Sequence, residues 1–468
     1  MKKKIYKSSG RLFLLLAMVM CTTLSCSDEF LDLQPQQAVS MSQALESKTD
    51  FEAAIVGCYD GLQSSPSYGK YFILVTDVMS DDLKGNTVVN RLSDWHSYLG
   101  TDADRVNLAY TLWARYYQII DRANRILTAD TDLELDEIYG QAYAFRALAL
   151  FDLVRIYGQH YTYTADASHL GVPIVTVVDP FQEPARNTVA DVYAQVITDF
   201  EAAMDLLDVD DDSFYFSDNV IKALLSRVYL YMEDWASAAA MAGDVIGSGD
   251  YSLVDNADYP SIFSGDHSSE TIFEVAMNET DNLGGGCLAA NYLSNGYNEY
   301  LPTYDLYDAF EDGDIRKETM IVVDSTIGGG DYGYIRVNKF VDVLGYENSP
   351  VVRLAELYLT RAEANYHLGA TVEAQADATT IRQRGLPSAP AVAATGEALL
   401  DEILLERRKE LCFEGHRLWD LTRNKRGVYR TDCTAGVCSI DYPNDGFVLA
   451  IGLQELEVND NIIQNKGY

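Results

Sequence analysis

The stretch Lys222-Ala-Leu-Leu-Ser-Arg-Val-Tyr-Leu-Tyr-Met-Glu-Asp-Trp235 decides the fold class of this 468-residue chain. Its apolar residues follow the i, i+3, i+4, i+7 spacing of an amphipathic helix, and a second helical stretch runs from Trp235 to Ile246. A similar pair spans Arg353 to Leu368 and Thr371 to Arg384. Helix pairs joined by such short turns are typical of tetratricopeptide units, although no fixed 34-residue period is present. We therefore predict a mainly α fold with a tetratricopeptide-like helix-pair scaffold.

Other helices and the segments between them complete this picture. Further helical patterns run from about Thr49 to Gln63, Arg105 to Ala129, Leu135 to Tyr157, Val189 to Leu207, Val351 to Leu368 and Glu397 to Phe413. Short strands are expected at Ile272–Ala276 and Tyr332–Phe340, with their pairing left open. We expect one domain over residues 41–468, with a helical scaffold at about 41–63, 105–157, 188–247 and 351–425, and with loop insertions at about 64–104 and 251–349. Loops of that length in a compact protein usually carry function.

Composition excludes several classes of protein. The chain is 48% hydrophobic, which is enough for a large core and excludes intrinsic disorder. It has 71 acidic against 35 basic residues and a formal charge of −36, so nucleic acid would be repelled and is not an expected partner. The 32 tyrosines outnumber the 16 phenylalanines. Tyrosine is favoured where one edge of a ring stays in contact with water.

The first residues have the pattern of a secretory signal peptide. Lysines and an arginine at positions 2, 3, 4, 7 and 11 precede the apolar run Leu12–Met20, which is too short to span a bilayer. The run ends at Thr23-Leu24-Ser25-Cys26, which resembles the lipobox of a bacterial lipoprotein. We expect residues 1–25 to be removed, Cys26 to be lipidated and residues 26–40 to form a tether. The alternative is cleavage that leaves Cys26 as a free thiol.

The remaining cysteines give no zinc pattern. Cys433 and Cys438 have four residues between them, so in an exported protein a local disulfide is an open alternative to two free thiols. Cys58 falls on an apolar helical face, which favours a buried small residue over a nucleophile. No metal or organic cofactor is demanded by any motif.

Catalytic motifs are not found, but an enzyme stays among the alternatives. A glycosidase needs only two suitably spaced carboxylates, and a chain with 71 acids cannot be shown to lack them. The alternatives to a binding protein are therefore a surface glycoside hydrolase and a tetratricopeptide-type protein-interaction module. One dense charged block invites a catalytic interpretation, but ion-paired scaffold is the better prediction for its members, which are Arg407, Arg408, Glu410, Glu414, His416 and Arg417.

Five motifs in order along the chain carry a family resemblance. They are Cys26-Ser-Asp-Glu-Phe-Leu-Asp-Leu-Gln-Pro35, the Lys222–Trp235 helix, Arg353-Leu-Ala-Glu-Leu-Tyr-Leu-Thr-Arg-Ala-Glu-Ala364, Glu406-Arg-Arg-Lys-Glu-Leu-Cys-Phe-Glu-Gly-His-Arg-Leu-Trp-Asp-Leu421 and Asn459-Asp-Asn-Ile-Ile-Gln-Asn-Lys-Gly-Tyr468. Together they resemble the SusD/RagB family. The resemblance implies a Bacteroidota outer-membrane lipoprotein that captures glycan and delivers it to a SusC-like TonB-dependent transporter. Ser27-Asp28-Glu29 resembles the acidic signal that sends such lipoproteins to the cell surface.

The resemblance also implies where the glycan binds. Ligand loops in the family come from the insertion after the first helix and from the middle of the chain, and both are aromatic here. We expect stacking and hydroxyl pairing from residues of the first insertion, Trp95, Tyr98, Asn86 and Arg91, and from residues of the second, Tyr292, Tyr297, Tyr300 and Tyr304. Polar neighbours suggest that Trp95 is exposed, and the Asn-, Gly- and Pro-rich surroundings of the tyrosines suggest loop.

Overall fold

The computed structural model describes residues 44–86, 90–100, 107–207, 212–264, 268–324 and 334–468. The chain divides into residues 1–50 and a much larger compact unit, residues 51–468. The signal peptide, Cys26 and the tether lie outside the described residues. No described helix is long and apolar enough to cross a membrane.

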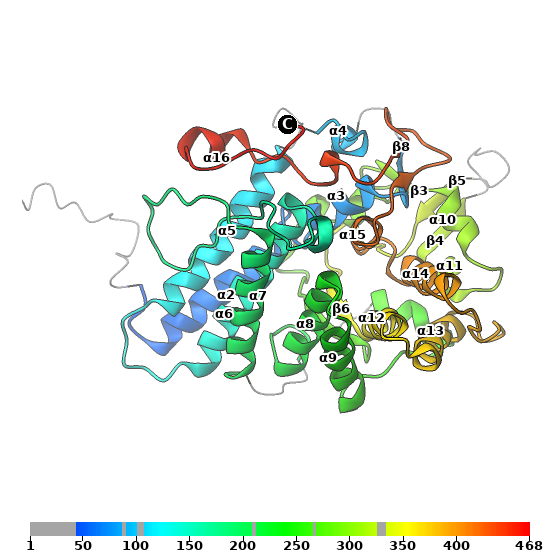
Figure 1. The fold of residues 1–468 in the computed structure, drawn as a ribbon, viewed down its shortest axis with the longest axis horizontal. Coiled ribbons are helices and arrows are strands. Elements are labelled where there is room, and N and C mark those ends of the chain that lie inside the picture. Colours follow the sequence, from blue (N-terminus) through cyan, green and yellow to red (C-terminus); the bar gives the residue numbers. More distant parts are fainter. Residues whose placement is uncertain (1–43, 87–89, 101–106, 208–211, 265–267, 325–333) are drawn as a thin grey trace, which may run out of the picture. The chain divides into compact units, whose positions relative to one another are not determined.

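A series of helices, each packed on the next, forms the scaffold. Its members are α5 (Leu108–Leu127), α6 (Asp136–Tyr157), α7 (Val189–Met204), α8 (Asp218–Met232), α9 (Trp235–Ser248), α12 (Leu354–His367), α13 (Thr371–Gly385), α14 (Glu397–Leu411) and α15 (Arg417–Arg423). The pairs α8–α9 and α12–α13 are the predicted helix pairs, and α9 packs directly on α12 although a long insertion separates them in sequence (Figure 1). The mainly α, helix-pair prediction is confirmed.

Local chemistry explains where these helices begin. The Thr188 hydroxyl and the Asp191 side chain form a reciprocal capping box at the start of α7. Between α8 and α9, Glu233 adopts a left-handed conformation (φ 62°) and the Asp234 side chain accepts a hydrogen bond from the Ser237 N–H. This two-residue turn sends α9 back along α8.

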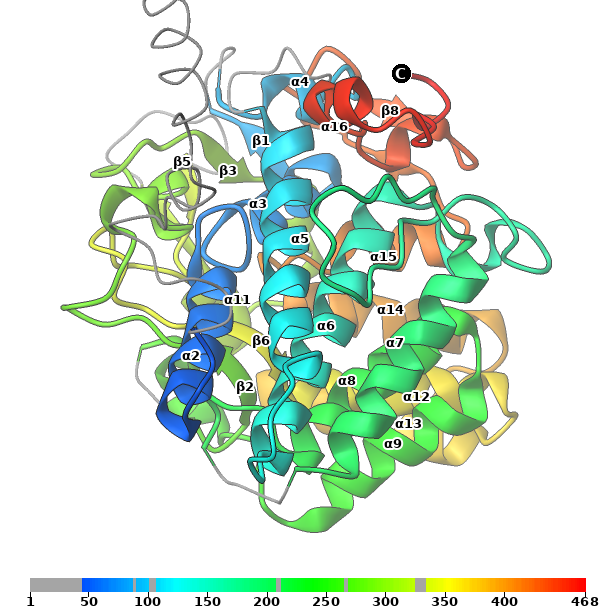
Figure 2. The same ribbon diagram turned by 90° about the vertical axis from the view of Figure 1, so that its left-hand side faces the viewer.

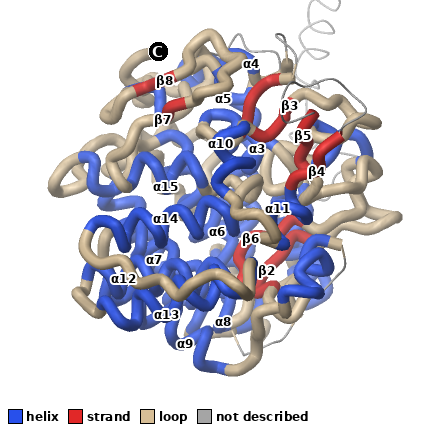
Figure 3. Tube along the Cα trace, turned by 90° about the vertical axis from the view of Figure 1, so that its right-hand side faces the viewer, coloured by secondary structure: helices blue, strands red, loops and turns tan. Residues whose placement is uncertain are grey.

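The described strands form four antiparallel pairs and no larger sheet. They are β1 (Leu83–Gly85) with β3 (Tyr300–Pro302), β2 (Thr271–Val275) with β6 (Ser349–Arg353), β4 (Ile321–Asp324) with β5 (Tyr334–Val337) and β7 (Val428–Tyr429) with β8 (Ser439–Ile440). Figure 3 shows β3, β4 and β5, which all belong to the second insertion, close together. The expected strands at 272–276 and 332–340 are present as β2 and β5.

The other described helices are α2 (Lys48–Gln63), α3 (Tyr71–Met79), α4 (Ser93–His96), α10 (Tyr304–Ala309), α11 (Ile315–Met320) and α16 (Leu453–Val458). The expectation of an irregular first insertion is wrong at α3. Eight of its nine residues are buried, so its sequence lacks the polar face that reveals an amphipathic helix. The helix expected from Val351 begins instead at Leu354, because the preceding residues belong to β6.

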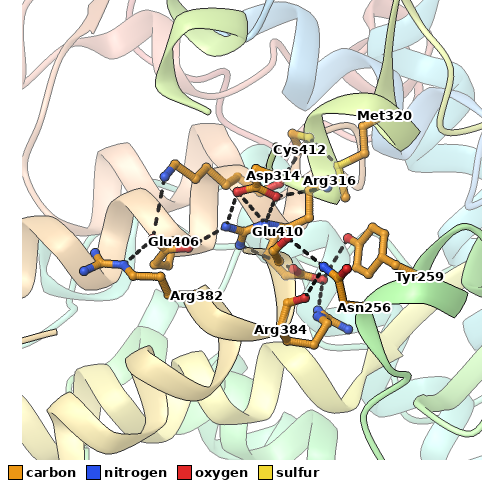
Figure 4. A network of polar contacts seen from close by, with 12 residues as sticks. Asn256, Tyr259, Asp314, Arg316, Met320, Arg382, Arg384, Glu406, Glu410 and Cys412 are labelled. Atoms are coloured by element: carbon orange, nitrogen blue, oxygen red, sulfur yellow. Dashed lines mark hydrogen bonds and ion pairs between the residues drawn. The ribbon is translucent and has the colours of Figure 1, made fainter. Parts of the chain in front are cut away.

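A buried network of arginines and carboxylates joins α14 to its neighbours (Figure 4). Glu410 on α14 pairs with Arg384 (2.6 Å) and Arg353 (3.2 Å) and lies 3.6 Å from Arg316. Nearby arginines hold the pKa of the Glu410 carboxyl well below its usual range, against a burial effect that would raise it. Because α13, β6, α11 and α14 each contribute a charge, the network fixes their relative positions. The prediction of scaffold ion pairs is confirmed for Glu410 and for Arg407, Arg408, Glu414 and Arg417, which pair with other carboxylates or arginines. It is wrong for His416, because burial lowers the pKa of this histidine to about 4 and leaves it neutral at pH 7.

Substitution of Glu410 tests how much this network stabilises the fold. Glu410→Gln leaves buried guanidinium groups without their carboxylate, so we expect the free energy of unfolding to fall by about 3–5 kcal/mol. The control is Asp401→Asn in the exposed pair with Arg426 (2.5 Å), where the loss should not exceed about 1 kcal/mol. Denaturant titration measures both, and equal losses would contradict a structural role for the buried network.

Candidate functional site

The two predicted insertions meet at the β1–β3 pair. Gly85 lies opposite Tyr300 and Lys84 opposite Leu301, and the Asn86 N–H extends the ladder by donating to the Glu299 carbonyl (2.8 Å). The Asn86 side-chain amide donates to the Asn298 carbonyl (2.9 Å). Residues more than 200 positions apart in sequence are therefore held side by side.

Tyr300 holds the rest of the first insertion against this pair. Its side chain is fully buried, and its hydroxyl donates to Asn90 Oδ1 (2.5 Å) and accepts from the Leu92 N–H (3.0 Å). These two hydrogen bonds place Arg91, between the two bonded residues, beside the second insertion.

Arg91 and Tyr297 form the centre of the candidate site. The Arg91 guanidinium lies 3.6 Å from the centre of the Tyr297 ring, and its Nη1 lies 2.9 Å from Glu299 Oε1. Tyr297 remains 46% exposed. A guanidinium stacked on an aromatic ring is a favourable cation–π contact and fixes the orientation of the ring. The result is an exposed ring with a rigid support behind it.

Acceptors next to this ring lack donors. Asn298 Oδ1 and Glu299 Oε2 are buried and accept no hydrogen bond from the described residues, whereas the Asn298 amide lies within 3.5 Å of the Tyr334 hydroxyl. A buried acceptor without a donor costs free energy, and such groups in a native structure call for an explanation.

A second aromatic position lies further along the same strands. The Lys84 ammonium is 3.7 Å from the centre of the Tyr304 ring and pairs with the Asp432 carboxylate, which also accepts from the Tyr304 N–H (3.0 Å). Tyr304 is half-buried and begins α10, so its expected place in an irregular loop is wrong. Lys84, Glu299, Asn298 and Asp432 have no recognisable sequence signal, because only the β1–β3 register brings them here.

Three predicted rings are not accessible. Trp95, Tyr292 and Tyr300 are fully buried, so the expectation that they present a face to ligand is wrong. For Trp95 the reason is the single turn α4, which exposes Asp94 and directs Trp95 and His96 inward, where the indole packs near Gly100 and Tyr468. Polar neighbours in sequence therefore do not imply an exposed ring.

The surroundings of Tyr98 are also structural. Its hydroxyl donates to the Met79 carbonyl, and Arg430 lies 5.3 Å from its ring. Burial, together with the positive charge of Arg430, lowers the pKa of His96 to about 3, so this histidine is neutral at pH 7. Cys433 and Cys438 form a disulfide that closes the adjoining hairpin, β7–β8.

Buried charges attach the site to the scaffold just before β1. Asp81 makes a two-bond ion pair with Arg417 (2.7 and 2.8 Å), and Asp82 pairs with Arg408 on α14 (2.6 Å). The backbone carbonyls of the same two aspartates accept from the hydroxyl and the N–H of Thr303, directly after β3. The charged block thus positions both strands of the site.

The arrangement defines a class of protein: a helical-repeat scaffold whose two converging insertions carry an exposed tyrosine ring supported by an arginine. A family profile described as "starch-binding associating with outer membrane" matches residues 29–230, and the SusD family profile matches residues 322–468. The chain belongs to the SusD/RagB family. Proteins of this family bind carbohydrate and are associated with the outer membrane.

Individual relatives agree along nearly the whole chain. SusD-like protein P38 of Formosa agariphila is 24% identical, with 91% of this chain and 93% of the relative covered. A solved structure from Bacteroides vulgatus is 30% identical (TM-score 0.82; 91% of this chain, 99% of the other). A SusD superfamily structure from Bacteroides thetaiotaomicron is 28% identical (TM-score 0.82; 89% and 99%), and a laminarin-binding SusD-like protein is 26% identical (TM-score 0.73; 90% and 100%).

The ion pair between Asp81 and Arg417 predicts that Arg417→Gln loosens the segment before β1. Loss of this guanidinium leaves the Asp81 carboxylate with a weaker partner, so the segment before β1 should open more often. We expect amide hydrogen exchange at Asn86 and Thr303 to accelerate roughly tenfold or more, which corresponds to at least about 1.4 kcal/mol. Arg426→Gln, in an exposed ion pair, is the control. Unchanged exchange at both amides would show that the ion pair does not hold the strands.

Proposed function

We propose that this protein is a surface lipoprotein that binds oligosaccharide or polysaccharide at the Tyr297 surface without transforming it, and that it delivers the glycan to a SusC-like TonB-dependent transporter. The main support for a glycan site here is the exposed Tyr297 ring, which Arg91 supports at the junction of both insertions. Membership of a carbohydrate-binding family also favours glycan binding over glycan hydrolysis.

The binding chemistry follows from the geometry. Arg91 covers one face of the Tyr297 ring, so the apolar C–H face of a sugar stacks on the rest of it. Sugar hydroxyls then pair with polar groups beside this ring that solvent can reach, such as the side-chain amide of the half-buried Asn86. Because the β1–β3 ladder and Tyr300 fix these groups beforehand, little conformational entropy is lost on binding. Tyr304, beside Lys84, extends the surface for a longer chain.

The anchor fits the same function. Lipidation of Cys26 would tether the chain to the outer membrane, and loss of residues 1–25 would bring the formal charge from −36 to −41. Such an acidic body is repelled by an anionic membrane surface, which favours a protein that stands away from the bilayer on its tether. A tethered binder cannot move glycan across a membrane, so a transporter partner is needed.

Truncation of the central ring tests the site. In calorimetry with laminarin oligosaccharides and the best ligand from a glycan array, Tyr297→Ala should bind about tenfold more weakly or worse, because ring stacking contributes on the order of 1 kcal/mol or more beyond area burial. The matched control is Tyr215→Ala, since Tyr215 is 47% exposed on a different surface, beside Tyr59. Parent-like affinity of a folded Tyr297→Ala protein would place the glycan elsewhere.

Substitution of the lipidation residue tests the anchor. Cys26→Ala should move the protein from the membrane fraction to soluble fractions, because the acyl chains that hold it would be absent. Protease treatment of intact cells measures the orientation of the parent protein. Full protection, or unchanged membrane retention of Cys26→Ala, would refute a lipid-anchored protein at the cell surface.

A further inference from the structure

One surface of the protein lies outside the glycan site and exposes large apolar side chains from two segments. The first segment, residues 174–185, connects α6 to α7 and exposes Phe181 (90%) and Val177. The second, residues 453–465, contains α16 and exposes Leu453, Val458 and Ile463. Exposed apolar side chains that gather on one surface mark interaction sites more often than isolated ones do.

Hydrogen bonds tie the two segments to each other. The Asn459 and Asn461 side-chain amides donate to the carbonyls of Pro184 (3.1 Å) and Glu183 (2.7 Å). The buried Arg186 guanidinium donates to the carbonyl of Ile463 (2.9 Å) and to Asn465 Oδ1 (2.8 Å). The C-terminal segment and the 174–185 loop therefore form one fixed surface, which we call the C-terminal apolar surface.

The exposure of Phe181 is built into its turn. The Phe181 N–H donates to Asp179 Oδ1 (2.9 Å), and the Gln182 N–H donates to the Asp179 carbonyl (3.3 Å). An aspartate that bonds to the backbone two residues later defines the turn conformation. The phenyl ring is thus presented to solvent by an ordered turn, which reduces the entropy lost when a partner covers it.

A cavity of about 280 Å³ opens on this surface. Its walls include Tyr110, Trp113 and Tyr117 of α5, and Val177 and Pro180 of the loop, with Glu455 of α16. Figure 2 shows α16 beside one end of α5, on which it packs. Rings, valines and prolines form the apolar part of its wall, and the polar part consists of Asp121, Arg125, Asp179, Gln182 and Glu455. Its size suits one bulky apolar side chain of a partner, the arrangement typical of the centre of a protein interface.

Charge limits what can cover the surface. Residues 174–185 and 453–465 contain the acids Asp179, Glu183, Glu455, Glu457 and Asp460 and no basic residue. The cavity walls add one base, Arg125, which is paired with Asp121 (2.7 Å), so the surface as a whole is acidic. A second copy of the chain would bring like charges together, and an anionic bilayer would be repelled in the same way. Charge complementarity instead favours a protein surface with basic residues around an apolar centre.

We infer that the C-terminal apolar surface is the docking site for the transporter, which contacts it with an apolar side chain in the cavity and with lysines or arginines around it. This inference rests on the proposed function for the identity of the partner. It separates two tasks in one chain, because glycan is bound at β1–β3 and the transporter at α16 and the 174–185 loop.

Co-purification from native membranes in mild detergent tests the docking site. Phe181→Asp and Val458→Asp each place a charge at the apolar centre, so the yield of the TonB-dependent barrel should fall at least tenfold relative to the parent. The matched control is Val372→Asp, because Val372 is 72% exposed on α13. Neutralising Glu457 and Asp460, as Glu457→Gln and Asp460→Asn, should reduce the sensitivity of the complex to salt.

Glycan calorimetry on the same variants separates the possible outcomes. Parent-like glycan affinity of Phe181→Asp shows that the variant is folded, so that loss of the barrel reports on docking. Equal recovery of the barrel with all variants would overturn the docking site and leave the proposed function standing. Two outcomes would overturn both the docking site and the delivery role. In the first, the parent protein retains no barrel. In the second, the parent protein is recovered as a dimer that Phe181→Asp dissociates.

Discussion

The buried ion pairs around α14 are the constraint on which the rest of the structure depends. Glu410 lies among Arg316, Arg353 and Arg384, and each of these arginines also pairs with another buried carboxylate, Asp314 or Glu270. Charges removed from water are tolerated only when their partners are held in good geometry, so these contacts enforce one arrangement of helices. The same helix then extends the constraint outward, because Arg408 pairs with Asp82 immediately before β1. The candidate binding surface is therefore anchored by the scaffold as well as by the β1–β3 ladder and Tyr300 within the insertions.

Much of the scaffold can be predicted from sequence, because amphipathic periodicity reports directly on which side of a helix is buried. The α8–α9 and α12–α13 pairs, the capping box at Thr188 and the structural use of Glu410 and Arg407 follow from local patterns that the structure confirms. The buried helix α3 has no such pattern. Nearly all its residues are enclosed, so burial no longer alternates along the sequence.

The candidate site is less predictable because it depends on contacts between distant residues. Aromatic content points to both insertions, and the β1–β3 pair does bring Asn86 and Arg91 to Tyr297. Composition cannot tell which ring is exposed, so Trp95 and Tyr300 were expected at the surface and lie in the core, while Tyr297 remains accessible. Glu299 and Asn298 become candidates only through a strand register that no local signal specifies.

The pairing of β2 with β6 has a consequence for how such proteins diverge. These strands, together with the Glu270–Arg353 ion pair, join the two ends of the segment 276–348 at the scaffold. Once the ends of a loop are fixed, the entropy of closing it grows only with the logarithm of its length, by about 0.6 kcal/mol per doubling. Insertions, deletions and exchanges within this segment that spare Asp314 and Arg316, which belong to the Glu410 network, therefore leave the packing of α9 on α12 almost unaffected. A lineage can therefore change the residues around Tyr297, the proposed glycan surface, while it keeps the same helical frame.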